Sequence, residues 1–136
     1  MLNMNIEKLG NGWVDLELII DGQSMLIVFE YTPNDALADI LASSIQLLSH
    51  KDNFTITFPN GSEKQMLNVK KTECNTCKVS IGEFSEQLSM KQYVRAVLGL
   101  FDRFIYAHSI EQYAEGWRRS FPQKELEMLR ASYRSL

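Results

Sequence analysis

The chain has 136 residues, 45% of them apolar and 23% charged, and a net charge of −3. These values are typical of a globular protein, and we expect one domain, residues 1–136, that buries roughly 68–70% of its unfolded surface without a metal or disulfides. No apolar run approaches the ~20 residues of a membrane span, and residues 1–13 lack the basic start and apolar block of a secretory signal. Two cysteines give no disulfide framework, so the sequence predicts a cytoplasmic protein.

Charge is distributed unevenly along the chain. Residues 1–60 carry eight acidic side chains against two basic ones, a net charge of −6, whereas residues 61–136 carry nine acidic against twelve basic, a net charge of +3. Phosphates are repelled by an acidic first half, which argues against nucleic acid as a partner. The first half therefore predicts either an acidic surface that attracts a basic partner or an ordinary solvated surface.

Residues 12–31 have the pattern of a β-hairpin. Apolar residues alternate from position 14 to position 20, and Asp21 and Gly22 suit the two positive φ values of a type I′ turn. The return strand, residues 25–29, is apolar on both faces, which predicts a covered central strand. Asp15 and Glu17 lie on the face opposite the apolar row. Paired carboxylates can serve acid–base chemistry or a hard cation, but no third ligand or base lies near them in the sequence.

A helix is predicted to follow the hairpin. Thr32 is expected to cap it and Pro33 to occupy its first position. Its buried stripe contains Leu37, Ile40, Leu41, Ile45 and Leu48. His50 comes after the last apolar turn, where an imidazole suits the negative end of the helix dipole.

Three short strands are predicted next, at residues 54–58, 65–71 and 77–81, as a meander with one wet face. Cys74 and Cys77 form a C-x-x-C pair between two of these strands. A structural zinc site needs four ligands, and only His50 and His108 remain as candidates, at no recognisable spacing. The pair is therefore interpreted as incidental hairpin cysteines, with a redox-sensitive pair and a metal site left open.

Residues 89–108 are predicted to form the core helix around which the other elements pack. Ser89 and Gln92 have the spacing of a capping box, and Gly99 indicates a close approach by a strand. The apolar stripe is wide, which indicates burial on more than one side. It contains Met90, Tyr93, Val94, Val97, Leu98, Leu100, Phe101, Phe104, Ile105, Tyr106 and His108.

The C-terminal tail is basic and helical. Gly116 predicts a break or tight packing, and Trp117 is more typical of a core position than of an exposed base-stacking platform. Ser120 is expected to cap the last helix, with Pro122 in its first turn. The basic residues predict a solvated helix face rather than a nucleic-acid groove. Overall we expect an α+β fold in the order ββαβββαα, with an antiparallel sheet of about five strands packed against the long core helix and two further helices.

The sequence contains no nucleophile constellation and no glycine-rich phosphate loop, so we predict no catalytic, cofactor-binding or metal-ligating residue. The tail does carry a pattern at regular spacing: Tyr113, Trp117, Phe121 and Pro122, followed by Leu126 and Leu129. With the Gly12 and Trp13 opening of the hairpin and the acidic first half, this layout resembles small bacterial α+β immunity proteins of polymorphic-toxin and contact-dependent growth inhibition systems. The resemblance implies a cytoplasmic protein that binds and blocks one toxin domain, often a basic nuclease, without catalysis.

A nuclease holds phosphates with basic groups, so an acidic surface can occupy the same site and gain association rate from electrostatic steering. The acids expected to form this partner-binding surface are Asp15, Glu17, Asp21, Glu30, Asp35 and Asp39. Two other classes remain open. One is a general interaction domain that dimerises through a sheet edge, and the other is an enzyme with a cleft between sheet and helices.

Overall fold

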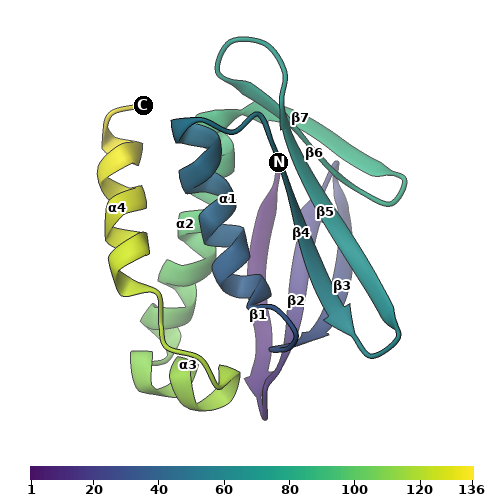
Figure 1. Cartoon of the computed structure of the whole chain (residues 1–136), viewed down its shortest axis with the longest axis vertical. Coiled ribbons are helices and arrows are strands. Elements are labelled where there is room, and N and C mark those ends of the chain that lie inside the picture. The colour runs from purple at the N-terminus through teal and green to yellow at the C-terminus, as the bar shows by residue number, and fades with distance from the viewer.

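The chain folds into seven strands and four helices, and the computed structural model describes all residues, 1–136. The strands are β1 (Asn3–Gly10), β2 (Trp13–Ile20), β3 (Gln23–Glu30), β4 (Asn53–Asn60), β5 (Glu63–Lys71), β6 (Thr76–Ile81) and β7 (Phe84–Ser89). The helices are α1 (Ala36–Ser49), α2 (Met90–Ala107), α3 (Ile110–Trp117) and α4 (Gln123–Arg134). The fold class is α+β, as predicted. The helices gather on one side of the molecule and the strands on the other (Figure 1).

The strands form two antiparallel sheets instead of the one predicted sheet of about five strands. Sheet A has the order β1-β2-β3, and sheet B has the order β4-β5-β6-β7. The sequence patterns missed β1 and β7, and they predicted three helices where the structure has four, because α3 is a separate helix between α2 and α4. In β1 the pairing register with β2 shifts between Ile6 and Lys8, and this irregularity breaks the apolar alternation of the strand. β7 is a polar edge strand with one buried side chain, Leu88.

The predicted hairpin is confirmed as β2 and β3, and its turn residues Asp21 and Gly22 have φ values of +50° and +74°. The prediction that the return strand is central is wrong, because β3 lies at the edge of sheet A. Leu26 on its outer side is 57% exposed. The apolar residues on the outer side of β3 therefore belong to a sheet face that no other part of the chain covers at Leu26.

Sheet B confirms the predicted meander and its wet face. Leu67 and Val69 of β5 are buried, while Met66 and Lys70 on the other side are exposed. The sheets meet in one continuous core of 34 buried residues, in which Phe29 of sheet A packs on Phe58 of sheet B with ring centroids 4.9 Å apart. Both sheets therefore share the core that the helices cover.

The helix termini follow the sequence predictions only in part. The capping box of Ser89 and Gln92 at the start of α2 is confirmed. At α1 the cap is Asp35, whose carboxylate accepts the Ala38 N–H at 3.0 Å, and not Thr32. At α4 the N-cap position is held by Pro122 without a side-chain hydrogen bond, so the predicted Ser120 cap is wrong. His50 occupies the C-cap position of α1, as expected.

The last residues of α2 are exposed to solvent. Tyr106 is 95% exposed and His108 is exposed at the C-cap, so neither belongs to the buried stripe. α3 packs back on β1 through Gly116, where an added Cβ would lie 3.1 Å from Leu9 Cγ, which confirms the predicted tight packing. The Gly12 N–H donates to the Gly116 carbonyl at 2.8 Å, which ties α3 to the β1–β2 turn.

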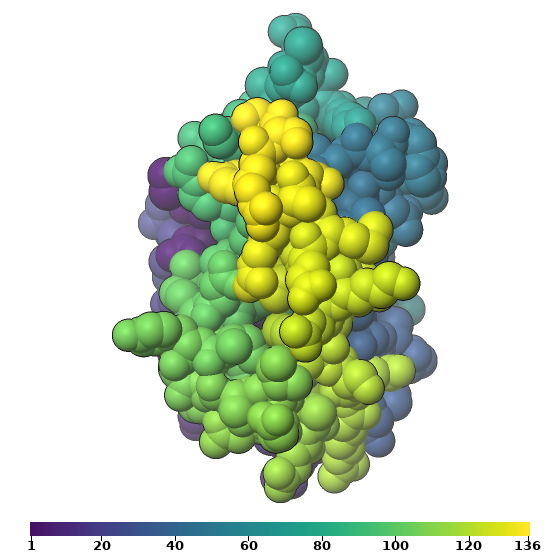
Figure 2. Space-filling model, turned by 90° about the vertical axis from the view of Figure 1, so that its left-hand side faces the viewer, coloured from purple at the N-terminus to yellow at the C-terminus, as the bar shows by residue number.

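α4 closes the helical side of the molecule. Figure 2 shows it in yellow across the front, with α1 in blue beside it and the green helices below. Arg130 of α4 forms an ion pair with Asp102 of α2, and Leu126 and Leu129 are buried. None of the four helices combines the length and apolar character needed to cross a bilayer.

Candidate functional site

The outer face of sheet A is the set of side chains that point away from the core on its three strands. Register places them in four cross-strand rows, because directly paired residues of antiparallel strands share a face. The rows are Gly10, Trp13 and Glu30; Lys8, Asp15 and Val28; Asn5, Glu17 and Leu26; and Asn3, Ile19 and Ser24. The residues of β2 that alternate with these positions point into the core and are buried: Val14, Leu16, Leu18 and Ile20. Trp13 is 40% exposed and Leu26 is 57% exposed, so this face presents apolar surface to solvent.

A chain of hydrogen bonds crosses this face. Glu17 accepts from Asn5 Nδ2 and from Ser24 Oγ, each at 3.2 Å, so its carboxylate links all three strands. Arg103 of α2 extends the chain over the free edge of β1. Its Nε donates to Asn5 Oδ1 at 2.6 Å and its Nη2 donates to the Met4 carbonyl at 2.6 Å. The edge strand is thereby held by a side chain that lies 98 and 99 residues further along the chain than its partners Asn5 and Met4.

Gly99 makes this arrangement possible. A Cβ added at Gly99 would lie 2.7 Å from Arg103 Nη1, so the Arg103 guanidinium occupies the space beside this glycine. The prediction that a strand approaches Gly99 is therefore wrong. The glycine accommodates the side chain that secures β1.

Replacing Arg103 by alanine is expected to loosen β1 and to lower the free energy of unfolding by about 1–2 kcal/mol, because the hydrogen bonds to Asn5 and Met4 are lost. Amide hydrogen exchange should accelerate most at Asn3 and Asn5, which pair with β2, because the main-chain N–H and C=O groups of Met4 face the free edge of the strand. Arg95→Ala on the same helix is the matched control, since Arg95 bonds only Tyr133 in α4. Equal exchange rates in β1 for both variants would remove the proposed role of Arg103.

The six acids predicted to form one surface are divided among three places. Asp15, Glu17 and Glu30 share the outer face of sheet A. Asp21 lies in the β2–β3 turn, at the opposite end of β2 from Trp13, and its N–H donates to Glu86 Oε1 at 2.7 Å. The remaining two, Asp35 and Asp39, lie at the N-terminal end of α1.

Several of these acids have structural partners in the chain. Asp35 caps α1 and accepts a hydrogen bond from Trp117 Nε1 at 2.8 Å, and Asp39 accepts from Asn34 Nδ2 at 3.0 Å. Glu30 accepts from Thr32 Oγ1 and from the Gly61 N–H, which joins the β4–β5 turn to the edge of sheet A. Asp15 is different, because no hydrogen bond or ion pair within the chain engages its half-buried carboxylate.

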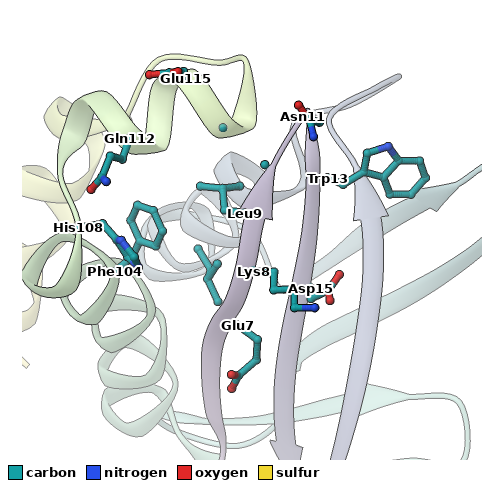
Figure 3. Close-up of a pocket in the computed structure, with 13 residues that line it drawn as sticks. Glu7, Lys8, Leu9, Asn11, Trp13, Asp15, Phe104, His108, Gln112 and Glu115 are labelled. Atoms are coloured by element: carbon teal, nitrogen blue, oxygen red, sulfur yellow. The ribbon is translucent and has the colours of Figure 1, made fainter.

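An open groove of about 850 Å³ adjoins the outer face and wraps around the irregular part of β1. Ile6, Leu9 and Phe104 line it, together with titratable residues from three elements. Figure 3 shows Glu7 and Glu115 at opposite ends, with Glu115 directed away from β1. In the same view Trp13 and Asp15 lie on the other side of β1 from His108. The groove thus spreads its ionisable groups along β1 and does not gather them around one point.

Comparison of the chain with protein-family models, with curated proteins and with solved structures gave no match.

The two cysteines are free and lie in different environments. Cys74 is exposed in the β5–β6 turn, and Cys77 is buried on the inner side of β6. Burial raises the pKa of the Cys77 thiol from its ordinary value of 9.0 to about 11. No group of three or more His, Cys, Asp and Glu side chains is placed to hold a metal ion. Cys77 therefore stays a neutral core thiol at physiological pH.

The sequence indicates that Trp13, Asp15 and Glu17 share one face, but it does not indicate that Leu26 is exposed there or that Arg103 secures β1. Leu26 was assigned to a covered strand, and Lys8, Gly10 and Asn5 lie in the strand that was missed. No local sequence pattern indicates the role of Arg103, because its hydrogen bond to Asn5 joins residues separated by 98 positions. The alternation of Trp13, Asp15 and Glu17 with the apolar row was the one available sign that they share an outer face.

Proposed function

We propose that the protein is a non-catalytic binding protein that neutralises a cognate toxin domain, in the manner of the immunity proteins that its layout resembles. The outer face of sheet A is the proposed contact surface. Its partner is a basic protein domain, for which a nuclease is the leading choice because a nuclease must carry cationic groups that hold phosphate. On this proposal the protein works in the cytoplasm, where the toxin domain acts.

The observation that carries this proposal is the composition of the exposed face. Among its twelve positions are three carboxylates, Asp15, Glu17 and Glu30, and one ammonium, that of Lys8. The exposed apolar surface of Trp13 and Leu26 lies directly beside these charges. Binding interfaces combine aromatic and apolar anchors with a polar surround, and a negative potential favours encounter with a basic partner.

The test has two steps: the genes next to this protein's gene are searched for a toxin domain, and binding and protection are then measured with that domain. We expect Asp15→Ser with Glu17→Ser to weaken binding at least tenfold and to remove much of its salt dependence, because the steering charges are lost. Asp52→Ser is the control, since Asp52 is exposed at the start of β4 and away from this face. Isothermal titration calorimetry between low and physiological salt measures both effects. An unchanged affinity in the double variant would reject the assigned surface, and absence of binding would reject the function.

The exposed apolar residues favour one second candidate, a homodimer that buries Trp13 and Leu26 against a second copy. Light scattering after size exclusion distinguishes the two. A stable dimer that Leu26→Lys converts to a monomer supports the homodimer, whereas a monomer that binds the toxin domain supports the first proposal. The remaining alternative, an enzyme, is not favoured by the groove beside β1, where Glu7 of β1 and Glu115 of α3 lie at opposite ends (Figure 3).

A further inference from the structure

Trp13 is an exposed tryptophan that has no neighbouring side chain on the β1 side. In register its neighbours are Glu30 on β3 and Gly10 on β1. Gly10 has no side chain, and a Cβ added there would meet no atom within 4 Å. The indole is therefore bordered by a carboxylate on one side and by open space on the other. Gly10, Trp13 and Asp15 all line the open groove, so a side chain from outside has access to this space.

Asp15 lies two residues from Trp13 on the same strand and the same face. Its carboxylate has no partner in the chain, and Lys8, directly across the strands, is not joined to it by an ion pair. Figure 3 shows the Trp13 and Asp15 side chains directed to the same side of sheet A. The structure thus places an unengaged carboxylate beside an accessible aromatic ring.

From this juxtaposition we propose that Trp13 and Asp15 form a receptor for one arginine side chain of the protein partner. A guanidinium is planar and weakly hydrated, so it stacks on an indole while its N–H groups donate to a neighbouring carboxylate. A lysine ammonium forms the same charge pair but lacks the flat face and the paired donors. The arginine occupies the open flank beside Gly10, with Glu30 adding negative potential from the far side. This inference rests on the proposed function for its partner and specifies the residue that the partner contributes.

The probes are two peptides of equal charge, hexaarginine and hexalysine, titrated at low ionic strength. Tryptophan fluorescence reports on the contact, because Trp13 is exposed whereas the other tryptophan, Trp117, is fully buried. We expect hexaarginine to change the emission and to bind at least fivefold more tightly than hexalysine. Trp13→Phe should remove the fluorescence response. The affinity of this variant for hexaarginine, measured by calorimetry, should fall by less than fivefold, because an aromatic ring remains.

Two charge variants separate a specific contact from general attraction. Asp15→Asn and Asp52→Asn remove the same charge by the same chemical change, and only the first lies on the outer face of sheet A. We expect Asp15→Asn to reduce hexaarginine affinity at least fivefold and Asp52→Asn to change it by less than twofold. Lys8→Met should increase the affinity, because the competing ammonium across from Asp15 is removed. Melting temperatures of all variants identify any loss of folding.

Equal affinity for the two peptides, or equal losses in Asp15→Asn and Asp52→Asn, would overturn the arginine receptor. The proposed function is tested separately, by binding to the toxin domain. If the toxin domain binds with full dependence on Glu17 and Glu30 but not on Asp15, the receptor fails and the function stands. If hexaarginine shows the expected pattern but the toxin domain does not bind, the function fails and the receptor describes a different basic partner.

Discussion

Replacing Trp117 by alanine is expected to lower the free energy of unfolding by about 3–5 kcal/mol, a large share of the roughly 5–15 kcal/mol that is typical of a native protein. Trp117 is fully buried, and its ring meets that of Phe29 edge-on with centroids 5.7 Å apart. Its Nε1 donates to Asp35 Oδ1, the residue that caps α1. One side chain therefore joins α3 to sheet A and to the start of α1. Urea denaturation followed by circular dichroism measures the change.

Two further variants divide this effect into its parts. Trp117→Phe keeps an aromatic ring in the core but loses the hydrogen bond to Asp35, and we expect it to lose about 1–2 kcal/mol relative to the wild type. Trp13→Ala removes the same residue type from an exposed site and should change stability by less than 1 kcal/mol. If Trp117→Ala unfolded at the urea concentration of Trp13→Ala, the assigned role of Trp117 in the core would be wrong.

The sequence predicted Trp117 correctly because a helical face repeats locally. Tyr113 and Trp117 are spaced by four residues, and both are fully buried on α3. The capping box at Ser89 was predictable for the same reason, since its two partners lie three residues apart. Asp35 shows the limit of local reasoning. Thr32 and Asp35 are both good capping residues. In the structure Asp35 is the N-cap, and its carboxylate also accepts a hydrogen bond from Trp117, 82 residues away, which local sequence patterns do not reveal.

The strands show a similar limit. Register shifts are set by pairing with a neighbour, so the irregularity between Ile6 and Lys8 left β1 without a recognisable period. Apolar residues on both faces of β3 predict burial on both faces, whereas the outer side of the strand is exposed at Leu26. Sequence alone does not distinguish a residue that its own chain covers from one that is available to a partner. The alternation on β2 therefore predicts the outer position of Trp13, Asp15 and Glu17, whereas the exposure of Leu26 on β3 is not predictable from its strand.

Alkaline pH is expected to destabilise the fold steeply, because three buried groups ionise with difficulty in the native state. Burial raises the pKa of Cys77 from 9.0 to about 11. Burial also raises the pKa of Tyr93 and of Tyr113 above the ordinary value of 10.0, and nearby negative charge, Asp35 in the case of Tyr113, adds to the effect. The Tyr93 hydroxyl is hydrogen-bonded to Ser43 at 2.6 Å, and this bond opposes part of the shift. The Tyr113 hydroxyl has no hydrogen-bond partner in the chain.

The sign follows from proton binding. Above pH 9 the unfolded chain releases the Cys77 proton while the native state keeps it, so stability falls as the pH rises towards 11. Above pH 10 the two tyrosines act in the same direction. Each group lowers the free energy of unfolding by about 1.4 kcal/mol per pH unit between its unfolded and native pKa values. Below pH 9 the three groups are neutral in both states and contribute no slope.

Urea denaturation at a series of pH values from 8 to 11 measures this slope, with tyrosinate absorbance as a second signal. Cys77→Ala should flatten the curve between pH 9 and 10, whereas Tyr113→Phe should leave that range unchanged and reduce the slope above pH 10. Tyr113→Phe is the cleaner of the tyrosine variants, because its hydroxyl has no partner to lose. Cys74→Ala is the matched control for the thiol, since Cys74 is exposed. A slope that none of these variants alters would show that the buried core groups are not the source of the alkaline transition.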